Sequence, residues 1–337
     1  MTLFAGVASK ALVVLIVLGL AGCAALRPSS TEPGVVDFTA FKERYQWPAI
    51  ASPRDLAIDP SGRYALLSFV SGPVSELTYL DLESGTSRQL ELEQPAPTSQ
   101  TAHAITISPR GNRFAAGWVG HGAIYDRDGH QIARKIDHSY GQTRVNYNDL
   151  TFSPDGQALV GALRDVVWWS VESGEKLHVI EDIEGPKRVD ISRDGILGVI
   201  TYQKVVLKDP RSGKNVCEFE GGATAIAFSA DGRHVAFATS ENPIVQVRRV
   251  SGCEEIGQLS FGATFIPVVA WMPDNKHLAT GSDDGRVRIW DALAGELVHS
   301  LQAHDGGLAG MVISKDGQTM ITVSWGDVVR SWEAERL

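Results

Sequence analysis

The sequence contains little cysteine and methionine, three and four residues among 337, and it lacks the common motifs of catalytic sites. A Gly-x-Ser-x-Gly elbow, a His-Glu-x-x-His pair and a Gly-x-x-x-x-Gly-Lys loop are all absent. These motifs position a nucleophile, a zinc ion and a nucleotide phosphate, respectively. The nine histidines are scattered, with no two at metal-ligand spacing on one expected strand. We therefore predict a protein that is not an enzyme and that holds no cofactor and no metal.

Positive charge is also scarce. The chain has 31 Lys and Arg residues against 40 Asp and Glu residues, a formal net charge of −9. Nucleic-acid-binding proteins carry a basic patch, and a protein that lies flat on anionic lipid needs clustered Lys and Arg. The charge balance argues against both modes, so we predict no nucleic-acid partner.

Only one long apolar run occurs, at residues 11–21, about half of the roughly 20 residues that a membrane-spanning helix needs. It follows a short segment whose one charge is Lys10, the layout of a signal peptide. The next residues, Leu20-Ala21-Gly22-Cys23, resemble the processing motif of bacterial lipoproteins. The resemblance implies that residues 1–22 are removed and that Cys23 becomes the acylated N-terminus.

The residues after Cys23 bear on location and tether length. Ala24 stands where an aspartate retains many enterobacterial lipoproteins at the inner membrane. The resemblance therefore implies a lipid anchor in the inner leaflet of the outer membrane, facing the periplasm, as the only membrane contact. Pro, Ser and Gly are frequent in residues 26–34, so we expect residues 23–40 to be the lipidated cysteine and a flexible tether. The folded domain is expected over residues 41–337.

A short turn motif repeats along that domain. The final residues of its seven copies lie 37 to 49 residues apart. Each copy lies between two short alternating apolar runs, the pattern of strands joined by a tight turn. A third run, a Ser-Gly or Ala-Gly turn in most units, and a fourth run complete the repeat, and helical periodicity is absent throughout. The copies are DPSG (59–62), SPRG (108–111), SPDG (153–156), SRDG (192–195), SADG (229–232), MPDN (272–275) and SKDG (314–317).

Four strands repeated about every 40–45 residues predict an all-β fold, a seven-bladed β-propeller of four-stranded antiparallel blades. The repeat resembles the Trp-Asp (WD) repeat family over nearly all of residues 41–337. Its clearest copy is residues 277–291, in blade six, which ends in Trp290-Asp291. Blades two, three and seven carry partial forms of that dipeptide, whereas blades one, four and five lack the tryptophan.

The ends of the domain predict how the ring closes. The chain stops three strands into blade seven, and an open ring would expose unpaired strand edges. The frame of blade seven places residues 41–47 where its fourth strand should lie. We therefore expect an N-terminal strand to pair with the last blade, with Phe41, Glu43, Tyr45 and Trp47 on one side.

WD repeats often connect the strands of a blade through a hydrogen-bonded set of His, Ser or Thr, Asp and Trp. The resemblance implies that Ser282, Asp284 and Trp290 form this set in blade six, without the histidine. In blade seven it implies His304, Ser324 and Trp332, with Gly326 where the aspartate would fall.

Two cysteines, Cys217 and Cys253, remain besides the lipidated one. The periplasm is oxidising, so a disulfide can form there. The two positions are not equivalent in the repeat, so a disulfide between them and two separately buried thiols both stay open.

Propellers bind partners at the ends of the central channel, where loops from all blades converge. Aligning the blades on their turn glycines gives Trp118 and Trp325 the same position in the loops between the second and third strands. Trp, Tyr and Arg dominate binding hot spots, although either tryptophan could instead pack over a neighbouring blade. Arg164 with Asp165, and Tyr202 with Lys204, continue this rim. The predicted partner-binding residues are Trp118, His121, Tyr140, Arg144, Tyr147, Arg164, Trp325 and Asp327.

We interpret the chain as an outer-membrane-anchored, monomeric propeller that acts as a protein-interaction scaffold or accessory subunit of a cell-envelope complex. Two other functions stay open. One is a propeller enzyme, lactonase-like or quinone-dependent, which would need convergent carboxylates with a metal or a stacking Trp with basic residues. The other is a glycan or peptidoglycan binder that stacks sugars on Trp118 and Trp325.

Overall fold

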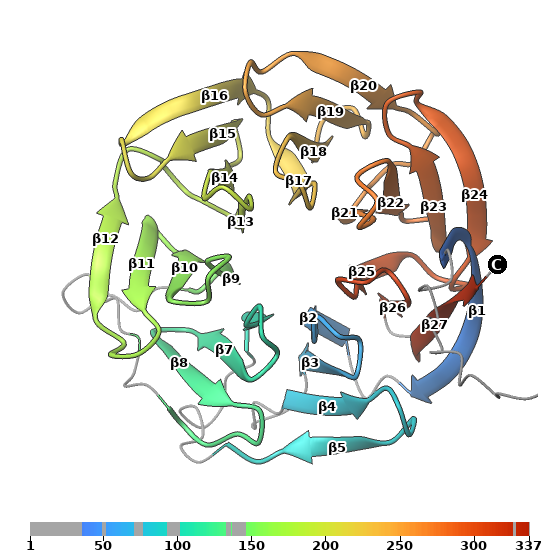
Figure 1. Ribbon diagram of the computed structural model, residues 1–337, viewed down its shortest axis with the longest axis horizontal. Coiled ribbons are helices and arrows are strands. Elements are labelled where there is room, and N and C mark those ends of the chain that lie inside the picture. Colours follow the sequence, from blue (N-terminus) through green and yellow to red (C-terminus); the bar gives the residue numbers. More distant parts are fainter. Residues whose placement is uncertain are drawn as a thin grey trace, which may run out of the picture. The chain divides into compact units, whose positions relative to one another are not determined.

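The computed structural model describes residues 36–48, 52–70, 77–92, 102–132, 136, 146–325 and 328–336. Over these residues seven antiparallel sheets are arranged around a central channel (Figure 1), which is the seven-bladed propeller that the repeat predicts. Within the described ranges no helix has the length and hydropathy needed to cross a bilayer. The expected signal peptide, Cys23 and most of the tether lie outside the described residues.

The first three blades follow the chain from the channel outward. Blade one comprises β2 (Ser52–Ile58), β3 (Tyr64–Val70), β4 (Leu77–Asp81) and β5 (Ser87–Leu90). Blade two comprises β6 (Ala104–Ile107), β7 (Arg113–Trp118) and β8 (His121–Asp126), with isolated bridges from Gln131 and Ile136 along the outer side of β8. Blade three comprises β9 (Asp149–Phe152), β10 (Ala158–Ala162), β11 (Val166–Ser170) and β12 (Lys176–Ile180).

The next three blades have four strands each. Blade four comprises β13 (Arg188–Ile191), β14 (Leu197–Ile200), β15 (Lys204–Asp209) and β16 (Lys214–Glu220). Blade five comprises β17 (Ala223–Phe228), β18 (His234–Thr239), β19 (Val245–Arg249) and β20 (Glu255–Leu259). Blade six comprises β21 (Val268–Trp271), β22 (His277–Gly281), β23 (Arg286–Asp291) and β24 (Glu296–Gln302).

The repeated tetrapeptide forms the turn between the first two strands of each blade. In blade three the Ser153 hydroxyl donates to Asp155 Oδ1 at 2.6 Å and accepts from the Ala158 N–H at 2.9 Å. The last position has a positive φ, 72° at Gly156 and 58° at Asn275, which explains why glycine or asparagine ends the motif. The turn residues therefore close the hairpin through their own side chains.

The hydrophobic cores lie between neighbouring blades. Blades one and two share a cluster that includes Tyr64, Tyr79, Phe114, Trp118 and Tyr125. The other blade seams contain corresponding clusters of Val, Ile, Leu and aromatic side chains. Fully burying one such large side chain contributes roughly 1.5–3 kcal/mol. The ring is thus held together by adjacent faces and has no single central core.

An N-terminal strand completes blade seven. β1 (Val36–Pro48) pairs antiparallel with β27 (Val328–Arg336), next to β26 (Thr319–Ser324) and β25 (Leu308–Ile313) (Figure 1). The strand also reaches blade one, because the Tyr45 hydroxyl and Trp47 Nε1 each donate at 2.9 Å, to the carbonyls of Glu83 and Gly85. β1 therefore joins the last blade to the first.

The expectation that Phe41, Tyr45 and Trp47 share one side was wrong. Phe41 packs against the core between blades six and seven, whereas Tyr45 and Trp47 pack between blades seven and one. A register shift between Glu43 and Tyr45 accounts for the difference. One extra residue in a strand turns the following side chains to the opposite face.

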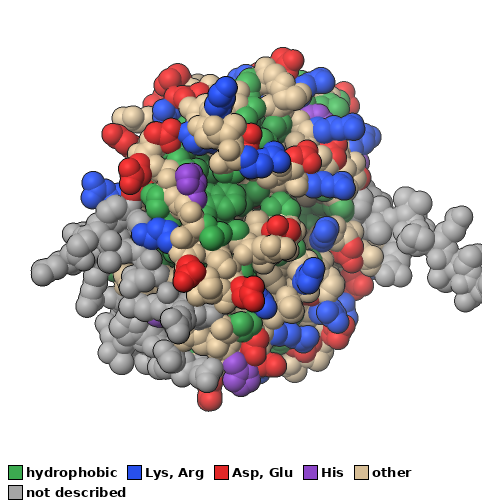
Figure 2. Space-filling model, turned by 60° about the vertical axis from the view of Figure 1, so that its left-hand side comes forward, with side chains coloured by type: hydrophobic (Ala, Val, Ile, Leu, Met, Phe, Trp, Pro, Cys, Tyr) green, Lys and Arg blue, Asp and Glu red, His purple; other side chains and the backbone are tan. Residues whose placement is uncertain are grey.

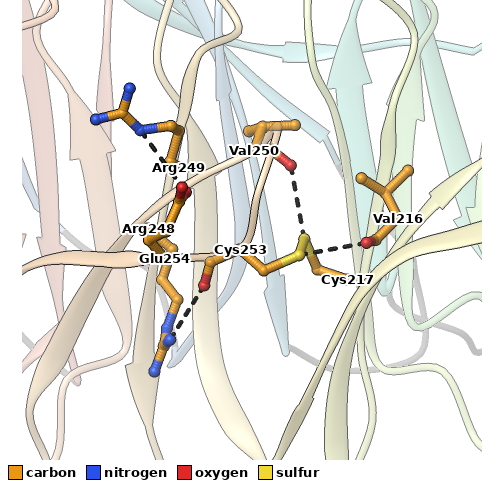
Figure 3. The surroundings of a disulfide bond; sticks show 7 residues. All are labelled: Val216, Cys217, Arg248, Arg249, Val250, Cys253 and Glu254. Carbon is orange, nitrogen blue, oxygen red and sulfur yellow. Dashed lines mark hydrogen bonds and ion pairs between the residues drawn. A yellow bond between two sulfur atoms is a disulfide. The ribbon is translucent and has the colours of Figure 1, made fainter.

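Cys217 and Cys253 form a disulfide, with their Cα atoms 5.7 Å apart (Figure 3). Cys217 lies on β16 of blade four, and Cys253 lies in the turn between β19 and β20 of blade five. Of the two states that the sequence left open, the structure has the bridge. The bond links the outer parts of two neighbouring blades.

Candidate functional site

The inner strands place three charged side chains on the channel wall. Asp55 on β2, Asp149 on β9 and Arg188 on β13 each stand four residues before the first residue of their blade's turn. The corresponding residues of the other blades are small or apolar: Ala104, Ala225, Val268 and Gly310. Asp55, Asp149 and Arg188 line a channel cavity of about 430 Å³.

The two aspartates also connect neighbouring blades. Asp55 accepts from the N–H groups of Leu56 at 2.9 Å and Ile105 at 2.6 Å. Asp149 accepts from Leu150 and Val189, both at 2.9 Å. Burial, followed by the nearby Asp149 carboxylate, raises the pKa of Asp55 to about 7, against the lowering effect of these N–H donors and Arg188. Burial also raises the pKa of Asp149.

One end of the channel opens into a second cavity of about 470 Å³, which we call the channel mouth. It shares six lining residues with the channel cavity: Arg54, Asp55, Asp149, Arg188, Pro267 and Ala309. Its further lining comes from loops and strand ends of blades two to seven. These further residues are His103, Asn148, Gly185, Lys187, Tyr202, Ala223, Thr224, Phe265 and Trp325.

Aromatic side chains are exposed at the mouth. Tyr202 is 75% exposed, Trp325 58% and Phe265 41%, and within the described ranges no other Phe, Tyr or Trp is this exposed. The Phe265 loop is fixed by a hydrogen bond from the Thr224 hydroxyl to the Ile266 carbonyl at 2.6 Å and one from the Asp283 N–H to the Phe265 carbonyl at 3.1 Å. Exposed aromatic side chains gathered on a defined backbone are typical of a binding surface.

Three cations at the mouth have no carboxylate within ion-pair distance among the described residues: Arg54, Lys187 and Arg188. Lys187 Nζ lies 3.0 Å from the centre of the Tyr202 ring, and an Arg54 guanidinium nitrogen lies 3.5 Å from His103 Nδ1. Burial and the neighbouring Arg54 lower the pKa of His103, which favours its neutral form. Arg188 acts electrostatically on the nearby Asp55 and Asp149, so Arg54 and Lys187 are the mouth cations that the described residues do not neutralise.

Elsewhere on the surface, cations are commonly paired. Over much of the face drawn in Figure 2, acidic and basic side chains lie next to one another around a hollow of hydrophobic side chains. Lys204 and Lys208, for example, lie 2.6 Å from Glu218 and Asp182, respectively. Lys204, which the sequence placed on the rim beside Tyr202, is therefore already engaged with a carboxylate.

The prediction that Trp118 is an exposed rim residue was wrong. Its side chain is completely buried in the core between blades one and two. It stacks on His121, with ring centres 5.6 Å apart, and meets Tyr125 edge-on at 6.5 Å. Trp118 is the last residue of β7, seven positions after Gly111, whereas Trp325 follows Gly317 by eight and lies just beyond β26. A shift of one residue reverses the face of a strand side chain, so the two tryptophans are not equivalent.

Tyr147 is likewise not on an exposed rim. It is buried, donates to the Ile136 carbonyl at 2.7 Å and stacks on Trp169. His121 is half-buried against Trp118, and Arg164 is exposed but does not line the mouth. Of the residues that the sequence placed on the rim, Trp325 and Tyr202 lie at the mouth within the described ranges. Tyr140, Arg144 and Asp327 fall outside the residues that the structure describes.

The hydrogen-bonded sets inside blades six and seven contain Thr280 and Thr322, which were not predicted from the sequence. Trp290 Nε1 donates to Thr280 at 2.9 Å, and Trp332 Nε1 donates to Thr322 at 2.8 Å. His304 Nε2 lies 2.8 Å from the same Thr322 hydroxyl, so blade seven joins His304, Thr322 and Trp332. The choice of Ser324 was wrong by two residues, one full strand period.

Ser282 and Asp284 of blade six bind each other and an arginine, and not Trp290. The Ser282 hydroxyl donates to Asp284 Oδ1 at 2.5 Å, and Arg288 donates to both side chains. Burial alone would raise the pKa of Asp284, but hydrogen bonds from Arg288 and Ser282 lower it to about 2. The aspartate is therefore ionised and fixes the loop between β22 and β23.

Most residues of the mouth were not predicted from the sequence. Phe265, Lys187 and His103 precede the first strands of their blades, whereas the predicted rim was drawn from the loops between second and third strands. Asp55, Asp149 and Arg188 did carry a signal, because a charge on an inner strand of otherwise small or apolar residues must face the channel.

The comparisons with known proteins agree with the repeat architecture. A family model described as WD domain, G-beta repeat matches residues 261–291 and 295–333, in blades six and seven. The chain is 25% identical over 222 residues to eukaryotic translation initiation factor 3 subunit I of Drosophila willistoni, covering 59% of this chain and 66% of that protein. It is 31% identical over 121 residues to an uncharacterized WD repeat-containing protein of Synechocystis, covering 36% of this chain and 34% of the relative.

A third relative matches a shorter segment. The guanine nucleotide-exchange factor SEC12 of Rattus norvegicus is 36% identical over 70 residues, which cover 21% of this chain and 16% of that protein. The chain thus spans less than two thirds of the length of each of these three relatives.

Proposed function

Because the chain is a seven-bladed WD-repeat β-propeller, we propose that it acts as a protein-interaction scaffold whose partner docks at the channel mouth. WD-repeat propellers generally bind protein partners. The observation that supports this location is the gathering of Tyr202, Phe265 and Trp325, which expose their rings around one cavity. Such rings offer large contact areas at small cost in side-chain entropy.

The buried Trp118 bears on the glycan-binding alternative. A sugar-stacking site built on Trp118 and Trp325 would require both ring faces to be accessible, and Trp118 is fully buried. The protein-scaffold proposal does not depend on Trp118. It is therefore the function that the geometry of the mouth supports best.

We further propose that the scaffold works in the cell envelope, anchored through an acylated Cys23 to the outer membrane. The support is the processing motif Leu20-Ala21-Gly22-Cys23 together with the disulfide between Cys217 and Cys253, since structural disulfides persist in oxidising compartments. Cys23→Ser should abolish acylation and leave a precursor or a soluble periplasmic form, scored by fractionation and electrophoretic mobility. Membrane recovery of the variant at wild-type mobility would count against the anchor.

Site-specific photo-crosslinking tests the docking site. A photoreactive amino acid is placed at Trp325 or Tyr202, and for comparison at Leu177 or Leu297, which are 60% and 50% exposed on the outer strands β12 and β24. We expect one discrete crosslinked protein from both mouth positions in native envelopes. Crosslinks from the outer strands alone would place the interaction elsewhere and refute docking at the mouth.

A further inference from the structure

The mouth combines two features that point to the chemistry of its occupant. Arg54, Lys187 and Arg188 lack carboxylate partners among the described residues, although the chain as a whole carries a net charge of −9. Around the same cavity stand the exposed rings of Tyr202, Phe265 and Trp325. Charged groups at protein interfaces are arranged so that opposite signs meet.

We propose that the channel mouth recognises an extended acidic segment of a partner protein in which Asp or Glu residues alternate with aromatic or aliphatic ones. This proposal rests on the proposed scaffold function and specifies its partner. The carboxylates pair with Arg54, Lys187 and Arg188, and the apolar side chains pack on Trp325 and Phe265.

The two carboxylates at the mouth, Asp55 and Asp149, act electrostatically on Arg188 but leave Arg54 and Lys187 without a carboxylate partner among the described residues. Asp55 and Asp149 use their oxygens to accept from backbone N–H groups of their own and the following blade. Neither forms an ion pair with a mouth cation within the described residues. Arg54 and Lys187 are therefore the mouth cations most available to a ligand.

The shape of the site fits an extended segment. The mouth of about 470 Å³ and the channel cavity of about 430 Å³ share six lining residues, so a chain entering the mouth can continue inward. Ala225 and Gly310, at the inner-strand positions equivalent to Asp55, keep that part of the wall free of large side chains. Cavities of several hundred Å³ with a few fixed polar groups are common binding sites.

Selection from a random peptide library displayed on phage tests the proposal without knowledge of the natural partner. The mature full-length protein is the bait, and the strongest selected peptide is then titrated as a free, terminally capped probe. We expect enriched sequences to combine Asp or Glu with aromatic or aliphatic residues. Replacing the acids of the probe with Asn or Gln should weaken binding about tenfold or more, and raising the salt from about 0.05 to 0.5 M should also weaken it.

Matched protein variants complete the test. Arg54→Ala and Trp325→Ala should each weaken the probe about tenfold or more, whereas Lys214→Ala and Leu297→Ala, both on outer strands, should leave binding unchanged. Arg54 is preferred to Arg188 because Arg188 also interacts electrostatically with the half-buried Asp55 and Asp149. Thermal melting of each variant establishes that the fold is intact.

Several results would overturn the proposal. They are enrichment of basic or uncharged peptides, no enrichment at all, or probe binding that is unchanged by Arg54→Ala. Full displacement of the probe by dextran sulfate, with direct binding of that polymer lost in Arg54→Ala, would identify the mouth as a polyanion site and not a peptide site. Crosslinking of a partner at Trp325 with no effect of Arg54→Ala on capture would refute the acidic segment while leaving the scaffold function in place.

Discussion

Blades two and seven, which define two sectors of the propeller, differ in whether a tryptophan near the end of the second strand is buried or exposed. In blade two Trp118 ends β7 and is buried under His121 and against Tyr125. In blade seven the equivalent residue is Ser324, and Trp325, one position later, leaves 58% of its surface exposed at the mouth. A single residue of register thus separates a core side chain from a surface available for binding.

The difference indicates which aromatic residues act in stability and which in recognition. Around blade two, aromatic rings fill the seam with blade one. Around the mouth, rings from blades four, six and seven remain uncovered, and Arg54, Lys187 and Arg188 line the same cavity. A substitution should therefore affect either the fold or partner binding, depending on the sector in which it lies.

The largest effect on stability is expected from Trp118→Ala. Removing a fully buried tryptophan should lower the free energy of unfolding by about 3–5 kcal/mol. Trp325→Ala is the matched control and should change it by about 0.5 kcal/mol or less. Chemical denaturation of both variants measures the difference, and equal costs would remove the distinction between the two sectors.

The disulfide between blades four and five provides the next largest effect. Replacing both Cys217 and Cys253 with Ala should cost about 2–4 kcal/mol of stability. Reducing the disulfide of the wild-type protein with a thiol reagent should lower its melting temperature. Because the bond does not line the mouth, probe binding below the melting temperature should be unchanged. A loss of binding without unfolding would show that the two regions are coupled.

The channel aspartates predict a pH dependence of stability. The pKa of Asp55 is raised from 3.8 to about 7 in the folded state, so its protonated form is favoured by folding. The stabilising contribution is complete below about pH 4 and is lost as the pH rises through 7. Relative to wild type, Asp55→Asn should therefore lose its disadvantage, or gain stability, as the pH rises from 4 to 8. If the free energies of unfolding of the wild type and Asp55→Asn changed equally between pH 4 and 8, the raised pKa of Asp55 would be contradicted.

The smallest effect concerns the closing strand. Trp47→Phe keeps most of the packing between blades seven and one but removes the donor to the Gly85 carbonyl. Losing one such hydrogen bond should cost about 1 kcal/mol, measured by thermal or chemical unfolding. Unchanged stability would limit the contribution of β1 to its backbone pairing with β27 and its apolar contacts.

The fold could be predicted from the sequence because the turn tetrapeptide and the alternating runs are local signals repeated seven times. Ring closure followed from the same frame, since a missing fourth strand had to come from the other end of the chain. The burial of Trp118 was not predictable from the repeat. The loop between β7 and β8 is only two residues long, so the tryptophan remains in the strand. The prediction of the hydrogen-bonded sets in blades six and seven was wrong because Thr280 and Thr322 lie one strand period from the predicted serines, on the same face of the strand.

The mouth itself depends on loops that meet only in the closed ring. Lys187 and Phe265 are separated from Trp325 by long stretches of sequence and lie in different loop classes, so no local pattern connects them. The exposed fraction of each ring also depends on neighbouring blades. Trp325 was identified by residue type, whereas its surroundings required the assembled propeller.

The central claim, that the partner binds at the mouth through Trp325, is tested most directly by a paired capture measurement. The amount of partner protein crosslinked from Tyr202 in native envelopes is measured for the wild type, Trp325→Ala and Leu297→Ala. The two variants are used only if they melt at the same temperature as the wild type. A hot-spot truncation costs about 2 kcal/mol, so Trp325→Ala should weaken capture roughly thirtyfold, while Leu297→Ala should match the wild type. Equal capture by all three proteins would contradict the claim.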